Sequence, residues 1–295
     1  AERRLASSWC AARGIVGRME LLESGAATKS AIIEQQLFPR VPYAIERPFL
    51  QRMEHYAVDF DDAVYLSPGN DPKLGRVLAG ARCVLVGNAN LAEYAARHAS
   101  RVEIVPTVLD LAAIAPRLEE PTGPITVGWV GLPYNFSYLD MLVEPMEQLL
   151  REFPDARLRV ISSRPPDALA IPFEFVRWSE AEETAALQSC HVGVMPLPDT
   201  EWERGKCAFK LLQYMAAGIP AVASPVGMNC EVLVHGDNGL LASTPSGWAT
   251  ALIEVARSCE LRDRLGRAGR ATVEARFSLA ACGPRVAALY SGIFR

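Results

Sequence analysis

A nearly continuous apolar run from Ile125 to Val130 ends at Gly131. A strand with hydrophobic side chains on both faces belongs inside a sheet that is covered on both sides, and such sheets are parallel. The loop 132–137 and a helical pattern over 138–153 follow the run. The run therefore predicts the first strand of a doubly wound parallel sheet.

Short apolar runs alternate with helical patterns along the rest of the chain, which predicts an α/β fold. After the first run, further strands are predicted at 158–161, 173–175, 192–195 and 221–224. Helices are predicted between them at 180–188 and 209–217, and at 246–259, 260–277 and 279–294 near the end.

The same alternation before residue 106 predicts a first domain with strands at 31–37, 56–58, 83–87 and 102–106. Helices are predicted at 7–22, 49–55, 74–80 and 90–98. A segment rich in proline and charge, 112–124, reads as a linker. We therefore expect domains at 1–117 and 118–278, with the helix of 279–295 as a candidate to cross back to the first domain.

Composition and charge exclude several classes of protein. The formal net charge is −4 over 295 residues, so the chain lacks the positive field that holds nucleic acid, and we expect no nucleic-acid partner. Seven dispersed cysteines form no close pairs of the kind that bind zinc. No apolar run approaches membrane-spanning length and no signal peptide begins the chain, so the predicted location is cytoplasmic.

The loops that follow strands in the second half carry the candidate binding residues, because open α/β sheets bind ligands at the carboxyl ends of their strands. Lys206 and Lys210 are four residues apart at the predicted start of a helix, where they could share one face and meet a diphosphate. Two solvated lysines on a surface helix are the alternative. Ser224–Gly227 turns the chain after the next strand, and Glu231 follows it.

The run HVGVMPLPDTEWERGKCAFKLLQYMAAGIPAVASPVGMNCEVLVHGDNGLLA (191–242) resembles the donor-site signature of retaining glycosyltransferases of family 4, which have the GT-B fold of two facing Rossmann-like domains. ITVGWVGLP (125–133) resembles the first strand and loop of that family's donor domain, and DFDDAVY (59–65) resembles a segment of its N-terminal domain. The resemblance covers roughly residues 30–295. It implies an incomplete N-terminal acceptor domain, because the family's first strand and glycine-rich loop are not found.

The resemblance implies transfer of a sugar from a nucleotide-diphosphate donor, UDP- or GDP-linked, to an acceptor with retention, in carbohydrate biosynthesis. It implies no metal and no cofactor besides the nucleotide sugar as substrate. The acceptor would be a carbohydrate, lipid-linked or small molecule, and peripheral membrane contact stays open. Lys206 and Lys210 would neutralise the diphosphate. The remaining donor contacts would come from Gly131, Gln213, Gly227, Met228, Asn229 and Glu231.

The sequence departs from the family at one pair of positions. Well-known members carry two glutamates eight positions apart, and the second holds the ribose. Gly205 and Gln213 stand at these positions here. Glutamine can still hydrogen-bond a ribose hydroxyl without supplying charge, and it is similar to the form of a bacterial branch. Glu203 lies nearby as a substitute for the first glutamate.

The acidic segment Asp59–Asp62 has three interpretations. Asp61 and Asp62 could face the cleft between domains and help to position the acceptor or balance developing charge. Asp59 and Asp61 could be the paired carboxylates of a magnesium-dependent phosphatase. One of the carboxylates could simply cap a helix. The phosphatase is one alternative function, and a non-catalytic sugar-nucleotide-binding protein is the other.

Overall fold

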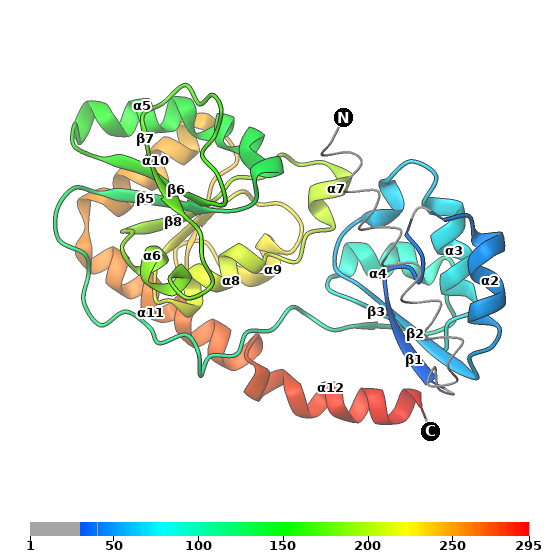
Figure 1. The fold of residues 1–295 in the computed structure, drawn as a ribbon. Coiled ribbons are helices and arrows are strands. Elements are labelled where there is room, and N and C mark those ends of the chain that lie inside the picture. Colours follow the sequence, from blue (N-terminus) through cyan, green and yellow to red (C-terminus); the bar gives the residue numbers. More distant parts are fainter. Residues whose placement is uncertain (1–29, 40, 295) are drawn as a thin grey trace. The chain divides into compact units, whose positions relative to one another are not determined.

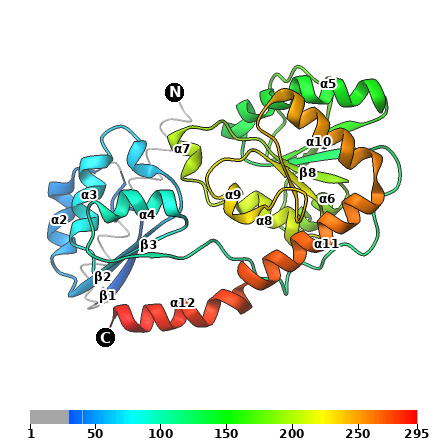
Figure 2. The ribbon, with the colours of Figure 1, turned by 180° about the vertical axis from the view of Figure 1, so that it is seen from behind.

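The computed structural model describes residues 30–39 and 41–294 (Figures 1 and 2). The helix predicted over 7–22 lies outside these residues. Two compact units make up the chain: Ala1–Pro106 with Val286–Arg295, and Thr107–Arg285. Each unit is built on one parallel sheet with helices, which confirms the α/β prediction.

The first unit has a four-stranded sheet in the order β1-β2-β3-β4, with every neighbouring pair parallel. Its strands are β1 (Ser30–Glu34), β2 (His55–Phe60), β3 (Cys83–Val86) and β4 (Val102–Ile104). Its helices are α2 (Tyr43–Leu50), the 3₁₀ turn η1 (Val64–Leu66), α3 (Asp71–Ala79) and α4 (Ala89–Ala96). Asn88 caps α4 by accepting a hydrogen bond from the Leu91 amide at 3.0 Å.

One face of the first sheet is covered by the end of the last helix of the chain, α12 (Leu279–Ile293). Ile293 is fully buried against Ala57 and Leu85, with Leu289 and Tyr290 packed around it. The residues from Val286 onward therefore belong to the first unit, although the second unit precedes them directly in the chain.

The second unit has a six-stranded parallel sheet in the order β10-β9-β8-β5-β6-β7. Its strands are β5 (Thr126–Val130), β6 (Arg157–Ser162), β7 (Phe173–Arg177), β8 (Val192–Met195), β9 (Ala221–Ala223) and β10 (Leu240–Leu241). From β5 the chain winds outward through β6 and β7, then returns to the other side of β5 at β8. The switch point of this doubly wound sheet is thus between β5 and β8, where ligands bind in such folds.

Helices cover both faces of the second sheet (Figures 1 and 2). They are η2 (Pro133–Leu142), α5 (Val143–Glu152), α6 (Glu183–Gln188), α7 (Glu201–Arg204), α8 (Phe209–Ala216), α9 (Asn229–Val232), α10 (Pro245–Arg257) and α11 (Cys259–Arg276). Thr244 and Ser258 cap α10 and α11 with their hydroxyl oxygens, which accept from the amides of Gly247 and Leu261.

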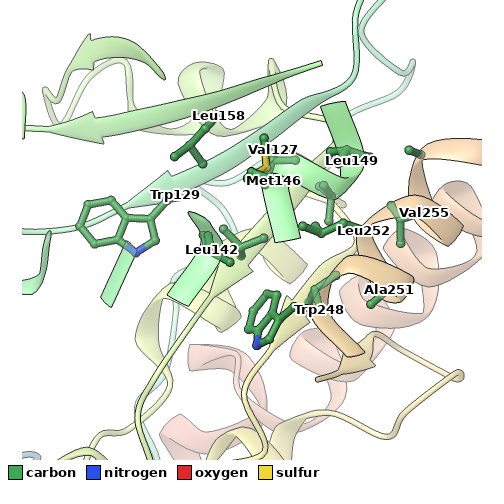
Figure 3. Close-up of a cluster of buried hydrophobic side chains, with 14 of the residues drawn as sticks. Val127, Trp129, Leu142, Met146, Leu149, Leu158, Trp248, Ala251, Leu252 and Val255 are labelled. Atoms are coloured by element: carbon green, nitrogen blue, oxygen red, sulfur yellow. The ribbon is translucent and has the colours of Figure 1, made fainter. Parts of the chain in front are cut away.

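The core of the second unit lies between the sheet and the helices α5 and α10 (Figure 3). Val127 and Trp129 of β5 point into it, and Met146 of α5 and Trp248 of α10 meet them there, all nearly inaccessible to solvent. Burial of large apolar side chains stabilises a fold by roughly 25 cal/mol per Å². This packing fixes β5, and the loop that follows it, on a rigid base.

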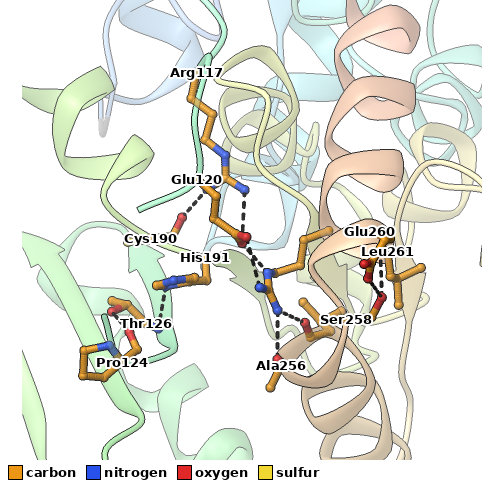
Figure 4. Close-up of polar contacts among 12 residues, drawn as sticks. Arg117, Glu120, Pro124, Thr126, Cys190, His191, Ala256, Ser258, Glu260 and Leu261 are labelled. Carbon is orange, nitrogen blue, oxygen red and sulfur yellow. Dashed lines mark hydrogen bonds and ion pairs between the residues drawn. The ribbon is translucent and has the colours of Figure 1, made fainter. Parts of the chain in front are cut away.

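The segment predicted as the linker packs on the second unit instead of separating the two (Figure 4). Arg117 donates to the carbonyl oxygen of Cys190 at 2.7 Å, and its own amide donates to Ala217. Glu120 accepts from the guanidinium of Arg262, which also donates to the carbonyl oxygens at the end of α10. The units divide after Pro106, earlier than the boundary predicted at 117/118, and these polar contacts tie Arg117 and Glu120 to the second unit.

Among the described residues, no helix is both long and apolar enough to cross a membrane.

Candidate functional site

The carboxyl ends of β5 and β8 separate at the switch point. In the described part of the chain, the two strands pair at Val127 with Val192 and at Gly128 with Gly193, and their pairing ends there. The hydroxyl of Tyr214, from α8, lies between them instead. It accepts from the Val130 amide at 3.1 Å and donates to the Val194 carbonyl oxygen at 3.2 Å. The sheet is therefore open where the loops after β5 and β8 begin.

Gly131 lies at this opening beside a cation. A Cβ atom on Gly131 would lie 2.5 Å from the Trp129 ring and 2.9 Å from Nζ of Lys210, so only glycine fits. The Lys210 ammonium is 4.9 Å from the centroid of the Trp129 ring. Two of the predicted donor residues are thus brought together, with the ammonium directly beside the backbone after β5.

The position of Lys210 in the first turn of α8 costs about 0.3–1 kcal/mol, because the amino end of a helix is positive. A cation over an aromatic face gains about 0.5–2 kcal/mol, depending on its exposure to water. The Trp129 ring therefore offsets the helix penalty and keeps the ammonium in place before any anion arrives.

Lys206 does not share the first turn of a helix with Lys210, contrary to the prediction from their spacing. α8 begins at Phe209, after Ala208 adopts the left-handed conformation with φ 55°. Lys206 lies in the loop between α7 and α8, with its ammonium 5.9 Å from the Trp202 ring centroid. Such a conformation costs a non-glycine residue about 1–2 kcal/mol, so surrounding contacts must hold this loop.

Glu203 of α7 supplies part of that support. Its side chain is 7% exposed and accepts hydrogen bonds from the hydroxyls of Tyr138, at 2.5 Å, and Thr200. The Lys206 amide donates to the Glu203 carbonyl oxygen at 3.1 Å. The carboxylate that could stand in for the family's first glutamate thus joins the loop after β5 to the loop after β8.

The loop after β9 packs against the same short helix. Gly227 has φ 51°, and a Cβ atom there would lie 2.7 Å from the Arg204 carbonyl oxygen. The Asn229 amide donates to Val226, whereas the amides of Gly227 and Met228 donate to no group in the described part of the chain. Gly227 is half-buried and Met228 is 2% exposed.

The other predicted donor residues lie on nearby elements. Gln213 is in α8 and 6% exposed, directly before Tyr214. Glu231 is exposed in the first turn of α9, where its amide donates to Met228. Gly205 ends α7. Roles for Gln213 and Glu231 in nucleotide binding stay predictions.

The acidic segment of the first unit follows β2. Burial, together with the neighbouring carboxylates of Asp61 and Glu34, raises the pKa of Asp59 to about 6. The Asp62 carbonyl oxygen accepts from the Val64 amide at 2.7 Å, directly before η1. The described residues contain no group of three or more His, Cys, Asp or Glu side chains that could hold a metal ion.

Three side chains at the edge of the second sheet were not among the predicted site residues. Tyr214 is one, and the glycine in the buried strand β8 was a signal for it, because glycine there indicates close approach of another group. Ser162 donates to the Gly131 carbonyl oxygen at 2.6 Å. Trp178 follows β7, is 42% exposed and donates to Glu183 at 2.7 Å.

Comparison with known proteins gives one family match and several similar folds. Residues 124–258 match the family model described as Glycosyl transferases group 1. A search of curated proteins finds no match.

Solved structures of glycosyltransferases have the same fold. A sucrose-phosphate synthase from Thermosynechococcus elongatus is similar over 95% of this chain and 79% of its own, with a TM-score of 0.73 and 17% identity. A glycosyltransferase from Rickettsia africae is similar over 96% and 82%, with a TM-score of 0.73 and 11% identity. Anabaena HepE, solved with UDP and glucose, is similar over 93% and 80%, with a TM-score of 0.67 and 13% identity.

The match of 124–258 to the group 1 family and the two parallel sheets shared with these structures support a GT-B glycosyltransferase.

Proposed function

We propose that the chain transfers a sugar from a nucleotide-diphosphate sugar to an acceptor with retention and without a metal ion, and that the second unit binds the donor. The observation that carries the proposal is the placement of the Lys210 ammonium beside Gly131 at the switch point of the second sheet. Ligands of doubly wound parallel sheets bind at the switch point, and glycine allows phosphate to approach the backbone there.

The proposed roles follow from the chemistry of each group. Lys210 and Lys206 neutralise the charge that develops on the departing nucleoside diphosphate, which is the role a metal ion has in other enzymes. The amides of Gly227 and Met228 donate to the sugar or the phosphate. Asp61 and Asp62 of the first unit take part on the acceptor side. HepE was solved with UDP and glucose, which makes UDP the first nucleotide to test.

Titration of the purified chain with UDP and GDP in the presence of EDTA tests donor binding. We expect saturable binding of one of them. Replacement Lys210→Ala removes a charge-assisted contact worth about 1.5–3 kcal/mol, so binding should weaken by about 10- to 150-fold. Arg151→Ala, which removes an exposed cation from α5, is the control and should bind as the wild type does. Equal binding by Lys210→Ala and the wild type would contradict the site.

Turnover distinguishes an enzyme from a protein that only binds nucleotide sugars. We expect slow release of UDP or GDP from the matching nucleotide sugar in EDTA, and an NMR spectrum of the transferred sugar with the anomeric configuration of the donor. Binding without any release of nucleotide would contradict catalysis by this chain, and an inverted product would contradict retention.

A further inference from the structure

We propose that Tyr214 is a positioning residue that sets the end of β5, and through it the Gly131 backbone and the Lys210 ammonium, for the nucleoside diphosphate; this rests on the proposed function. Four observations support the assignment, each from a different part of the second unit.

The first observation is the double hydrogen bond of the Tyr214 hydroxyl. It accepts from the Val130 amide and donates to the Val194 carbonyl oxygen, so it replaces the hydrogen bond that two adjacent strands would otherwise share at this level. Val130 directly precedes Gly131. The phenol therefore fixes the direction in which the chain leaves β5.

The second observation is the space made for the ring. A Cβ atom on Gly193 would lie 2.4 Å from Cγ of Tyr214, so glycine in the middle of β8 allows the ring to pass beneath the strand. Tyr214 is 1% exposed, and burial raises its pKa well above the usual range. The phenol is therefore protonated at neutral pH and can donate to Val194.

The third observation is the spacing along α8. Lys210 and Tyr214 are four residues apart in this helix and hence on the same face. Both contact the end of β5: Tyr214 at Val130, and Lys210 over the Trp129 ring. One face of α8 therefore contacts the end of β5 through Tyr214 and places the Lys210 ammonium beside it.

The fourth observation is that two hydrogen bonds from β6 hold the Gly131 backbone on the side away from Tyr214. Its amide donates to the Ile161 carbonyl oxygen at 3.1 Å, and its carbonyl oxygen accepts from Ser162 at 2.6 Å. Both contacts come from β6. With β6 on one side and Tyr214 on the other, the backbone after β5 is held before the ligand binds, which lowers the cost of binding.

Tyr214→Phe tests the proposal because it keeps the ring under Gly193 and removes only the hydroxyl. We expect the Kd for the bound nucleotide, UDP or GDP, to rise about tenfold, as small displacements of binding groups do. Tyr56→Phe is the matched control: Tyr56 is also buried and its hydroxyl donates to Val77 at 2.8 Å, but in the first unit. Val255→Ala, which thins the core of the second unit, controls for a general loss of stability.

The double variant Lys210→Ala with Tyr214→Phe shows whether the two residues act together. We expect it to bind within about twofold of Lys210→Ala alone, because the hydroxyl acts through the position of the ammonium. Additive losses would overturn that part of the proposal. A Kd for Tyr214→Phe within twofold of both controls would overturn the proposal while the proposed function stands. A wild-type chain that binds neither UDP nor GDP would overturn both.

Amide hydrogen exchange of the wild-type chain tests the geometry without any variant. The Val130 amide, at the very end of its strand, should exchange as slowly as the amides in the middle of β5, because the buried phenol protects it. Rapid exchange at Val130 would overturn the proposal even if Tyr214→Phe failed to fold.

Discussion

At the scale of single residues, the unusual group of the first unit is Asp59. It lies at the end of β2, where Asp61 and Glu34 are its acidic neighbours and burial is the largest cause of its raised pKa. Burial raises the pKa of the Tyr290 phenol in α12, and the charge of Asp59 raises that pKa as well. An ionised carboxylate here destabilises the folded chain.

We predict that Asp59→Asn stabilises the chain at neutral pH but not at pH 4. The folded pKa is raised, so the folded chain binds the proton more tightly than the unfolded chain, and stability falls as pH rises from about 4 to about 6. The difference between variant and wild type should therefore grow by about 2–3 kcal/mol over that window and then stay constant. Urea unfolding at several pH values measures it. A pH-independent difference, or the same growth in the exposed control Asp155→Asn, would contradict the prediction.

The sequence predicts some residues of the site better than others, for a physical reason. Gly131 and Lys210 could be found because a glycine after a buried strand and a cation near a helix start are local patterns. Tyr214 could not, because its two hydrogen-bond partners lie on strands that only the folded sheet brings together. The Trp129 ring over which Lys210 lies was hidden for the same reason.

At the scale of elements, the alternation of strands and helices predicts the sheets well, and the errors fall at boundaries. α8 begins at Phe209, as predicted, and the left-handed Ala208 before it leaves Lys206 outside the helix that holds Lys210. The helix predicted at 49–55 is instead α2 at Tyr43–Leu50, which begins after Pro42 and includes Pro48. Buried Glu46 of α2 holds the loop after β1 by accepting from the Leu37 amide, a contact that no local pattern reveals.

The ion pair between Glu120 and Arg262 shows how one side chain can connect several segments of the second unit. Arg262 is 7% exposed, pairs with Glu120 and donates to the carbonyl oxygens of Val255 and Ala256, which end α10. Several buried polar groups would lose their partner at once if the guanidinium were absent.

We predict that Arg262→Leu lowers the free energy of unfolding of the second unit by about 3–5 kcal/mol. Tryptophan fluorescence during urea unfolding reports on this unit through Trp129 and Trp248. Arg267→Leu is the matched control, since Arg267 pairs with Asp263 on the surface of the same helix and is 78% exposed. It should change stability by less than about 1 kcal/mol. Similar losses of unfolding free energy in both variants would contradict the prediction that the buried contacts of Arg262 stabilise the unit more than a surface ion pair does.

At the scale of the whole molecule, the two units are built from unequal parts of the chain. The second is continuous from Thr107 to Arg285, whereas the first combines residues up to Pro106 with those from Val286 onward. Ile293 fills the face of the first sheet at Ala57 and Leu85. The stability of the first unit therefore depends on residues near the far end of the sequence.

We predict that Ile293→Ala destabilises the first unit by about 2–5 kcal/mol and leaves the second unit unchanged. Hydrogen exchange followed by mass spectrometry should show faster exchange in peptides from β2 and β3 but not in those from β5 and β8. Ile45→Ala is the control, because Ile45 is 48% exposed on α2 and should cost less than about 0.5 kcal/mol. Equal acceleration in both units would contradict the division of the chain.

The packing of Ile293 also bears on how the protein is made. A ribosome releases a chain from its first residue onward, and most domains begin to fold as soon as they emerge. Here the first sheet leaves the ribosome early, yet the helix end that covers one of its faces is synthesised only after the entire second unit. Until Ile293 is synthesised, the apolar side chains of Ala57, Cys83 and Leu85 are not covered by α12. We therefore expect chaperones to bind the first unit during synthesis.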